Sequence, residues 1–280
     1  MKFGIIYANG AAPDRESALE LATAAERLGF ESLWTTEHVV VPRGYESAYP
    51  YSRSGRMRVG EDMPSPDPLV WLAFMAGVTE TIRLATGILI VPQRNPLILA
   101  KEVASLDVLS NGRVTLGVGA GWLKEEFDAL GVSFSDRGDR TDEAIRLMRT
   151  VWTEELPSFS GDFHSFADVY VRPMPVQQPV PIVVGGHSKR AARRAGELGD
   201  GFFPAAAHYD SLPDLVALAR EHAERAGRDP AALEVTMGTR PTAEWVEKLV
   251  GVGVDRILIP AGFGVEALEA FSAEFIKGTG

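Results

Sequence analysis

The stretch Ser110-Asn111-Gly112-Arg113-Val114-Thr115-Leu116-Gly117-Val118-Gly119-Ala120-Gly121-Trp122 decides the fold. Its Asn-Gly turn precedes a β-branched run, which predicts a strand, and this run opens directly onto three glycines. A second strand of this kind, Pro181-Ile182-Val183-Val184, leads into Gly185-Gly186-His187-Ser188, where the serine is placed to cap a helix. Glycines at a strand end allow the backbone to approach another group closely. Two such strand ends predict one phosphate-bearing ligand held between them.

Short β-branched segments alternate with longer segments of helical period along the chain, which indicates a parallel α/β fold. The expected strands are 2–8, 32–36, 83–90, 113–118, 182–184, 201–205, 233–237 and 255–260. The expected helices are 16–28, 69–79, 97–109, 141–152, 189–198, 212–226, 243–250 and 265–276. Eight β/α units in 280 residues predict a (β/α)8 TIM barrel that forms a single domain over residues 1–280. Its active site is expected at the C-terminal ends of the strands, and a doubly wound open sheet is the alternative architecture.

Two connections are longer than is usual in a β/α fold. Residues 153–181, after the fourth helix, are expected to form a hairpin-like insertion that ends in a proline-rich connector. Residues 39–66, after the second strand, are expected to overhang the active-site face as a lid. They concentrate basic and aromatic residues, namely Arg43, Tyr45, Tyr49, Tyr51, Arg53, Arg56 and Arg58. Arginines there can pair with an anion and tyrosines can cover an apolar ring, whereas the alternatives are a solvated loop and a dimer contact.

The composition argues against several classes of function. The formal net charge of −10 and the lack of any run of basic residues argue against a nucleic-acid partner. Without cysteine the chain has no disulfide, thiol nucleophile, iron–sulfur cluster or cysteine-bound zinc, and its five histidines lack metal-ligand spacing, so no metal is expected. No apolar stretch is long enough for a signal-peptide core or a membrane span. We therefore expect a cytoplasmic protein without a membrane partner.

His38 is the candidate catalytic residue. It follows Leu33-Trp34-Thr35-Thr36-Glu37 at the end of the second strand, so in a barrel it would face the active-site mouth and transfer a proton near neutral pH. A structural histidine is the alternative. Glu125 and Glu126 lie at the start of a helix, where adjacent side chains point in different directions. We expect a solvated first turn in which Glu126 is the one that faces inward.

The glycines have competing interpretations. Gly185-Gly186-His187-Ser188 places free backbone N–H groups at a helix N-terminus, which favours a phosphate site over an ordinary capped turn. Gly117-Val118-Gly119-Ala120-Gly121 lacks the GxGxxG spacing of a dinucleotide site, and a tight turn with close helix packing is its alternative. Gly87, inside the third strand, marks a bulge or a close ligand, or else is a packing glycine. The charged residues at 136–143 are expected to start a helix with surface ion pairs.

Several stretches together resemble the bacterial luciferase-like oxidoreductases, in the branch that uses the deazaflavin coenzyme F420. They are 29–38 (GFESLWTTEH), 85–88 (ATGI), 106–113 (LDVLSNGR) with the glycines that follow, and 183–188 (VVGGHS) with 199–201 (GDG). The resemblance implies a TIM barrel with the cofactor ring over a bulge at Gly87-Ile88, built as a non-prolyl cis peptide, and it implies a homodimer. It also implies that His38 lies near the reactive face. The implied cofactor-binding residues are Thr86, Gly87, Ile88, Gly119, Gly121, Trp122, Gly185, Gly186, His187 and Ser188.

One position departs from that family. Its sugar-phosphate dehydrogenases carry a catalytic glutamate just after the glycines of the fourth strand, where this chain has Trp122. A tryptophan offers a flat apolar wall, which favours an apolar or aromatic substrate. The leading hypothesis is a coenzyme F420-dependent oxidoreductase that transfers a hydride between the deazaflavin C5 and a small organic substrate. The alternatives are a flavin mononucleotide (FMN) monooxygenase of the same fold that uses oxygen, and a non-catalytic cofactor-binding barrel.

Overall fold

Parallel strands close into a barrel in the computed structural model, which describes residues 1–52, 54–57, 59–204, 206–238 and 242–278. The barrel strands are β1 (Lys2–Ile6), β2 (Ser32–Thr35), β3 (Arg83–Thr86), β4 (Leu89–Ile90), β5 (Val114–Gly119), β8 (Ile182–Gly185), β9 (Gly201–Phe203), β10 (Glu234–Gly238) and β11 (Arg256–Pro260). They neighbour one another in the order β3-β2-β1-β11-β10-β9-β8-β5-β4, and a further pairing of β3 with β5 closes the ring. β4 resumes the line of β3, so the two together fill one position of the eight. The predicted TIM barrel is confirmed, and the open-sheet alternative is wrong.

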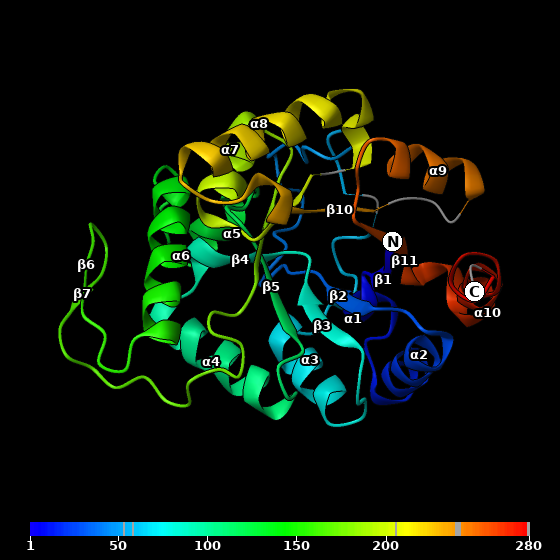
Figure 1. Ribbon diagram of the computed structural model, residues 1–280, viewed down its shortest axis with the longest axis horizontal. Helices are drawn as coiled ribbons and strands as arrows, with labels where there is room; N and C mark the ends of the chain where they lie inside the picture. Colours follow the sequence, from blue (N-terminus) through cyan, green and yellow to red (C-terminus); the bar gives the residue numbers. More distant parts are fainter. Residues whose placement is uncertain (53, 58, 205, 239–241, 279–280) are drawn as a thin grey trace.

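Helices surround the strands on the outside of the barrel (Figure 1). They are α1 (Ala8–Ala11), α2 (Arg15–Leu28), α3 (Pro68–Ala76), α4 (Pro96–Leu109), α5 (Lys124–Ala129), α6 (Arg137–Thr153), α7 (Lys189–Leu198), α8 (Leu212–Arg225), α9 (Ala243–Gly251) and α10 (Gly264–Phe271). Side chains of Asp14, Asp67, Asn95 and Ser188 cap α2, α3, α4 and α7 by accepting hydrogen bonds from first-turn amides. Among the described residues, no helix is both long and apolar enough to cross a membrane.

Irregular backbone cuts short two of the expected strands. The strand expected at 2–8 ends at Ile6, because Tyr7 adopts a left-handed backbone (φ 63°) and a helix begins directly after it. The strand expected at 83–90 is interrupted where a cis peptide bond joins Gly87 to Ile88, as the family resemblance implies. Both irregularities lie at the C-terminal end of a strand, where a barrel carries its site.

Two apolar clusters stabilise the barrel. The larger lies between strands and helices and includes Ile5, Leu33, Leu84, Val184 and Ile257. The smaller consists of Ile6, Trp34, Ala85, Val183 and Leu258, with Phe203 packed against it. Members of the two clusters alternate along β1, β2, β3, β8 and β11, so the smaller cluster points to the opposite face and fills the barrel interior. Trp34, which is fully buried, is the largest side chain of this inner cluster.

The second long connection carries the antiparallel pair β6 (Phe159–Ser160) and β7 (Ser165–Phe166), which projects from the barrel beyond α6 (Figure 1). Glu143 of α6 holds the tip of this hairpin. Its buried carboxylate accepts hydrogen bonds from Asp162 N (2.6 Å) and Phe163 N (3.0 Å) and lies 3.0 Å from His164 Nδ1. The expectation of surface ion pairs along 136–143 is therefore wrong for Glu143, because the hairpin covers it.

Candidate active site

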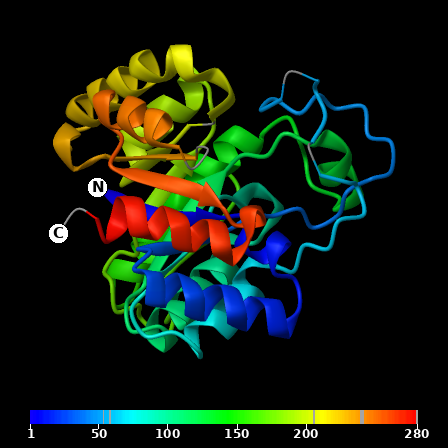
Figure 2. The ribbon, with the colours of Figure 1, turned by 90° about the vertical axis from the view of Figure 1, so that its right-hand side faces the viewer.

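The C-terminal ends of the strands form a mouth where the predicted site residues meet. His38 follows β2, the Gly87-Ile88 bulge joins β3 to β4, Trp122 follows β5, and Gly186 follows β8. Segment 39–66 lies at the same end of the barrel, the end toward which the β11 arrow points (Figure 2). Loops at this end converge on the barrel axis, which is why TIM barrels carry their active sites there.

Ile88 fills the space between two of the glycine-lined strand ends. A Cβ on Gly119 would lie 1.8 Å from Ile88 Cδ1, and a Cβ on Gly185 would lie 2.5 Å from Ile88 Cγ2. These glycines therefore make room for the chain's own bulge, and the phosphate-bearing ligand predicted between the two strand ends stays a prediction. Gly87 and Ile88 are partly exposed while Thr86 and Leu89 on either side are buried, so the bulge forms part of the surface of the mouth.

The bulge is supported from below by β5. Thr86 is buried, and its hydroxyl donates a hydrogen bond to Gly117 O (2.7 Å). A Cβ on Gly117 would lie 1.8 Å from Thr86 O, so β3 and β5 approach this closely only because residue 117 is glycine. Gly121 has a φ of 80°, a value that favours glycine, and packs against Phe127. Close packing thus accounts for these glycines.

His38 is held by a buried carboxylate of α5. Its Nδ1 lies 3.0 Å from Glu126 Oε2, and the same carboxylate accepts hydrogen bonds from Val39 N (2.6 Å) and Val40 N (3.3 Å). The Glu126 side chain is 0% exposed, whereas 21% of the His38 side chain is exposed. Within the described part of the chain, no hydrogen bond to His38 Nε2 is found, so that nitrogen remains available to a ligand. The inward orientation predicted for Glu126 is confirmed.

Glu125 anchors a later part of segment 39–66. It accepts hydrogen bonds from Glu46 N (2.7 Å) and Ser47 N (2.9 Å), so the expected solvated first turn is wrong. Burial raises the pKa of Glu125, but the hydrogen bonds from Ser47 and Glu46 outweigh it and lower this pKa to about 2. The two adjacent carboxylates therefore fasten two different points of the same segment.

An aromatic wall stands beside His38. Trp122 makes edge-to-face contacts with His38, Tyr45 and Tyr49, at centroid distances of 5.8, 5.4 and 5.0 Å. Tyr49 in turn contacts Tyr51 at 5.3 Å. The arrangement brings Tyr45 and Tyr49 of segment 39–66 onto Trp122, three residues after the end of β5. The flat apolar wall that the sequence predicts for a substrate at Trp122 stays a prediction.

The arginines of segment 39–66 are placed differently from the tyrosines. Arg56 donates a hydrogen bond to Tyr45 O and lies 4.7 Å from the centre of the Tyr45 ring, so it stabilises the segment itself. Arg43 is exposed. Arg53 and Arg58 lie outside the described residues. The predicted pairing of these arginines with an anion stays a prediction.

A third carboxylate, that of Glu37, fixes the strand end next to the bulge. Glu37 is buried and accepts hydrogen bonds from Ile90 N (2.6 Å) and Arg94 Nε (3.1 Å). Burial raises the pKa of Glu37, and the Arg94 guanidinium acts in the opposite direction. Arg94 also binds Asp67 at 2.8 Å, which connects this group to the cap of α3. These contacts connect the end of β2 to β4 and to the N-terminus of α3.

The turn after β8 presents the N-terminus of α7 to the mouth. Ser188 caps the helix by accepting a hydrogen bond from Ala191 N (3.2 Å), as predicted. Gly186 has a φ of 127°, and its N–H donates to Phe203 O (3.1 Å), so the expectation that this N–H is free is wrong. His187 Nε2 lies 2.8 Å from Ser211 Oγ. Ala191 N–H is thus used by the cap, whereas the amides of Lys189 and Arg190 in the same turn lack intrahelical acceptors and can meet an anion.

Cations accompany this helix N-terminus. Arg137, at the start of α6, donates to Gly121 O (3.2 Å). Burial, and then the positive charge of Arg190 of α7, lowers the pKa of Arg137. A negatively charged group bound at the α7 N-terminus would relieve this repulsion. Arg137 and Arg190 were not among the predicted site residues.

Three further residues of the mouth were missed. Tyr7 follows β1 and is 48% exposed, while Trp34 and Phe203 close the floor beneath Gly87. A Cβ on Gly87 would lie 2.9 Å from Trp34 Cε3 and 3.3 Å from Phe203 Cε1. The only signal available for them was position, since each lies at or near the end of an expected strand. Strands buried on both faces do not reveal which residues point inward.

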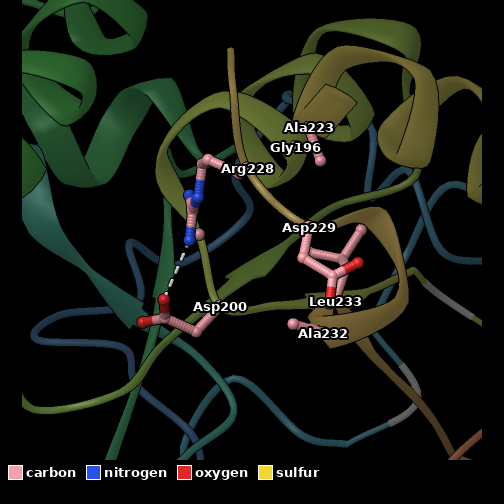
Figure 3. Close-up of a pocket in the computed structure, with 8 residues that line it drawn as sticks. Gly196, Asp200, Ala223, Arg228, Asp229, Ala232 and Leu233 are labelled. Atoms are coloured by element: carbon pink, nitrogen blue, oxygen red, sulfur yellow. Dashed lines mark hydrogen bonds and ion pairs between the residues drawn. The ribbon is translucent and has the colours of Figure 1, made fainter. Parts of the chain in front are cut away.

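Two cavities lie at the opposite end of the barrel. One, of about 260 Å³, is lined by Asp200, Arg228, Asp229 and Leu233, residues that come just before β9 and β10 (Figure 3). Asp200 is held there by Arg228 (2.9 Å) and Arg149 (2.7 Å). In TIM barrels this N-terminal face serves stability, so the cavity is not the candidate active site.

Comparisons with known proteins agree with this geometry. The model of the luciferase-like monooxygenase family matches residues 1–244. An uncharacterized protein of Mycobacterium tuberculosis is 33% identical over 248 residues, which cover 88% of this chain and 85% of that protein. An F420-dependent glucose-6-phosphate dehydrogenase of Kineococcus radiotolerans is 32% identical over 226 residues, 78% of this chain and 61% of the relative. A solved F420-dependent secondary alcohol dehydrogenase, in complex with an F420–acetone adduct, shares the fold with a TM-score of 0.78, 21% identity and 97% coverage of both chains.

Proposed function

The chain belongs to the luciferase-like monooxygenase family, within its F420-dependent branch, and from this premise we propose that it is a coenzyme F420-dependent oxidoreductase. It moves a hydride between the deazaflavin and a small organic substrate. The observation that carries the proposal is the pairing of His38 with the buried Glu126 at a mouth that also holds the Gly87-Ile88 bulge. A histidine in that place handles the proton that accompanies a hydride.

The residues of the mouth fit the cofactor. The partly exposed bulge offers an apolar support for a planar ring, and the α7 N-terminus with Arg137 and Arg190 offers a site for its phosphate. When bound, F420 supplies a hydride donor or acceptor at C5 of its ring. The chain binds and orients that ring, while His38 Nε2 accepts a proton from the substrate or returns one to it.

The same wall of side chains defines the substrate class. Trp122, Tyr45 and Tyr49 pack together beside His38, so a substrate that contacts both His38 and this wall meets aromatic surface. We propose a small apolar or aromatic alcohol, or the corresponding carbonyl compound. A sugar phosphate is disfavoured, because Trp122 occupies the position where the family's sugar-phosphate dehydrogenases carry their catalytic glutamate.

Titration of the purified protein with F420 and with FMN, followed by fluorescence quenching, tests the cofactor. We expect tight binding of F420 and weak binding of FMN. Preference for FMN together with oxygen consumption would favour the monooxygenase alternative. Binding of F420 without turnover of any alcohol or carbonyl compound would favour the non-catalytic barrel.

Turnover by a His38→Ala variant tests the role of the histidine. We expect a decrease of about 10²–10⁴-fold, typical of the loss of a general acid–base group, with F420 affinity unchanged. His164→Ala is the matched control, since His164 also lies 3.0 Å from a buried glutamate but in the hairpin outside the mouth. Equal turnover in wild type and His38→Ala would make His38 a structural residue.

A further inference from the structure

Glu126 is surrounded by donors and accepts from each of them. Its Oε1 receives Val39 N–H and Val40 N–H, and its Oε2 faces His38 Nδ1 at 3.0 Å. The carboxylate is completely buried, and a buried carboxylate is tolerated when its oxygens are hydrogen-bonded in this way. An ionised carboxylate has no hydrogen to donate, so the hydrogen between the two side chains sits on Nδ1.

The position of that hydrogen determines whether the other ring nitrogen, Nε2, can accept a proton. A neutral imidazole carries one N–H, so a hydrogen on Nδ1 leaves a lone pair on Nε2. Nδ1 is the nitrogen that the carboxylate occupies, and Nε2 is the one left for a ligand in the mouth. Without an acceptor at Nδ1, the hydrogen could move to Nε2, which could then no longer accept a proton.

We propose that Glu126 is a positioning residue that holds His38 in the Nδ1–H tautomer, so that Nε2 is the proton acceptor of the reaction. The inference rests on the proposed function and extends it. In the oxidation direction the substrate O–H gives its proton to Nε2, and its carbon gives a hydride to the bound deazaflavin. The two electrons leave with the hydride, and a C=O bond forms. In the reverse direction the Nε2–H returns the proton to the carbonyl oxygen, and Glu126 stabilises the imidazolium charge in between.

The neighbouring residue provides a matched control. Glu125 also sits in the first turn of α5 and also holds segment 39–66 through two backbone amides. It contacts no histidine in the described structure. Removing the charge of Glu125 therefore loosens the segment without changing the imidazole, whereas removing the charge of Glu126 changes both.

Glu126→Gln is the decisive variant, because the amide has nearly the shape of the carboxylate but different hydrogen-bonding groups. Its oxygen can still accept from Val39 N–H, and its NH₂ group then faces His38 Nδ1 as a donor. Nδ1 must accept, so the hydrogen is expected to move to Nε2. The readout is the ¹⁵N spectrum of the histidine rings in labelled, cofactor-free protein, recorded about two pH units above the ordinary histidine pKa of about 6.5.

We expect Nδ1–H for His38 in wild type and in Glu125→Gln, and Nε2–H in Glu126→Gln. His164 and His222, which face Glu143 and Glu197 through Nδ1, serve as internal references and should not change. Turnover of Glu126→Gln should fall by about 10²–10⁴-fold with F420 affinity retained, as for a general base in the wrong tautomer. Glu125→Gln should lose much less turnover than Glu126→Gln, because His38 keeps its Nδ1–H tautomer.

An Nε2–H signal in wild type, or no shift in Glu126→Gln, would overturn the positioning role even if the enzyme proves to be an F420-dependent oxidoreductase. A tautomer shift with unchanged turnover would overturn it as well, because His38 would then not carry the proton. If Glu126→Gln does not fold, the wild-type spectrum still decides, since only Nδ1–H agrees with the proposal. Failure of the proposed function is detected separately, by the lack of F420 binding in wild type.

Discussion

The side chain of Ile88 occupies the space that Gly119 leaves open by having no side chain. A Cβ on Gly119 would lie 1.8 Å from Ile88 Cδ1, closer than any two nonbonded carbons can approach. The bulge at the end of β3 therefore requires the glycine at the end of β5. Two positions that are far apart in the sequence determine together the surface on which a cofactor ring would rest.

Gly119→Ala should destabilise the protein by about 1–3 kcal/mol, because the new methyl group overpacks the Ile88 side chain. Urea denaturation measures the change. Ile88→Val removes the Cδ1 atom that clashes. The double variant should therefore lose less free energy of unfolding than the sum of the losses in the two single variants. Gly251→Ala is the control, since a Cβ there meets nothing within 4 Å. Additive effects would show that Gly119 and Ile88 are independent.

Gly186→Val should reduce the free energy of F420 binding by more than it reduces the free energy of unfolding. The residue has a φ of 127°, and its Cβ would lie 3.1 Å from Ala191 Cβ in the first turn of α7. A branched side chain would distort the turn that presents the helix N-terminus to a phosphate. Gly227→Val is the control, because its φ of 72° is also positive but its surroundings are open. If Gly186→Val and Gly227→Val bound F420 equally tightly, this turn would not be the phosphate site.

The ionisation of Glu125 should make the free energy of unfolding depend on pH in the acidic range. Its pKa is lowered from 4.5 to about 2 in the folded state. A carboxyl with a lowered pKa stabilises the fold above its unfolded pKa, and that contribution is lost as the pH falls through the folded value. Between pH 4.5 and 2, wild type should therefore lose stability more steeply than Glu125→Gln. If the free energies of unfolding of wild type and Glu125→Gln changed equally with pH over this range, Glu125 would not stabilise segment 39–66 through its charge.

Segment 39–66 should become more protected when F420 and substrate bind. In the free protein, amides of Val39 and Ser47 are already held by carboxylates of α5, so we expect slow hydrogen exchange there and faster exchange nearer the tip. Ligands that contact Tyr49 should slow exchange around it. Asp162 N–H is the control, since Glu143 holds it outside the mouth. Unchanged exchange with saturating ligands would remove the lid role.

A second copy of the chain is the partner that we propose, in a homodimer. Val70 and Phe74 on α3 and Ile98 on the neighbouring α4 are 69%, 37% and 60% exposed, an apolar surface that a second copy could cover. Val70→Asp should shift the protein toward monomer in sedimentation experiments. The matching exposed substitution Val250→Asp on α9 should not. A monomeric wild type would contradict the proposal.

The sequence predicted most of the framework because the framework depends on local patterns. Alternation of strand and helix gave the closed barrel, and capping residues such as Ser188 marked helix starts that the structure confirms. The role of Glu126 depends on a contact with His38 across 88 positions, which no local pattern records. A glutamate in the first turn of a helix is usually solvated, and here the segment after β2 covers it.

The glycines illustrate the same limit. Their number at the ends of β5 and β8 correctly predicted a close approach, but the approaching group was taken to be a ligand. The structure shows that Ile88, from a third strand end, occupies that space. Likewise Gly186 lies at the predicted turn, yet its N–H is used by Phe203 O of the next strand. Such assignments need the packing between strands, which follows only from the closed barrel.

Asn9 binds both ends of the long connection after β2. Its amide nitrogen donates to Thr36 O (2.9 Å) and Pro66 O (2.8 Å), and its oxygen accepts from Thr36 N (3.0 Å). The span between those two ends is thus set by one side chain of α1, whatever lies between them. Between them, the residues after the α5 contacts at Val39 and Ser47 form a loop whose length and side chains can change without moving a strand. New substrate preferences can then be acquired by grafting this one piece of chain onto an unaltered barrel.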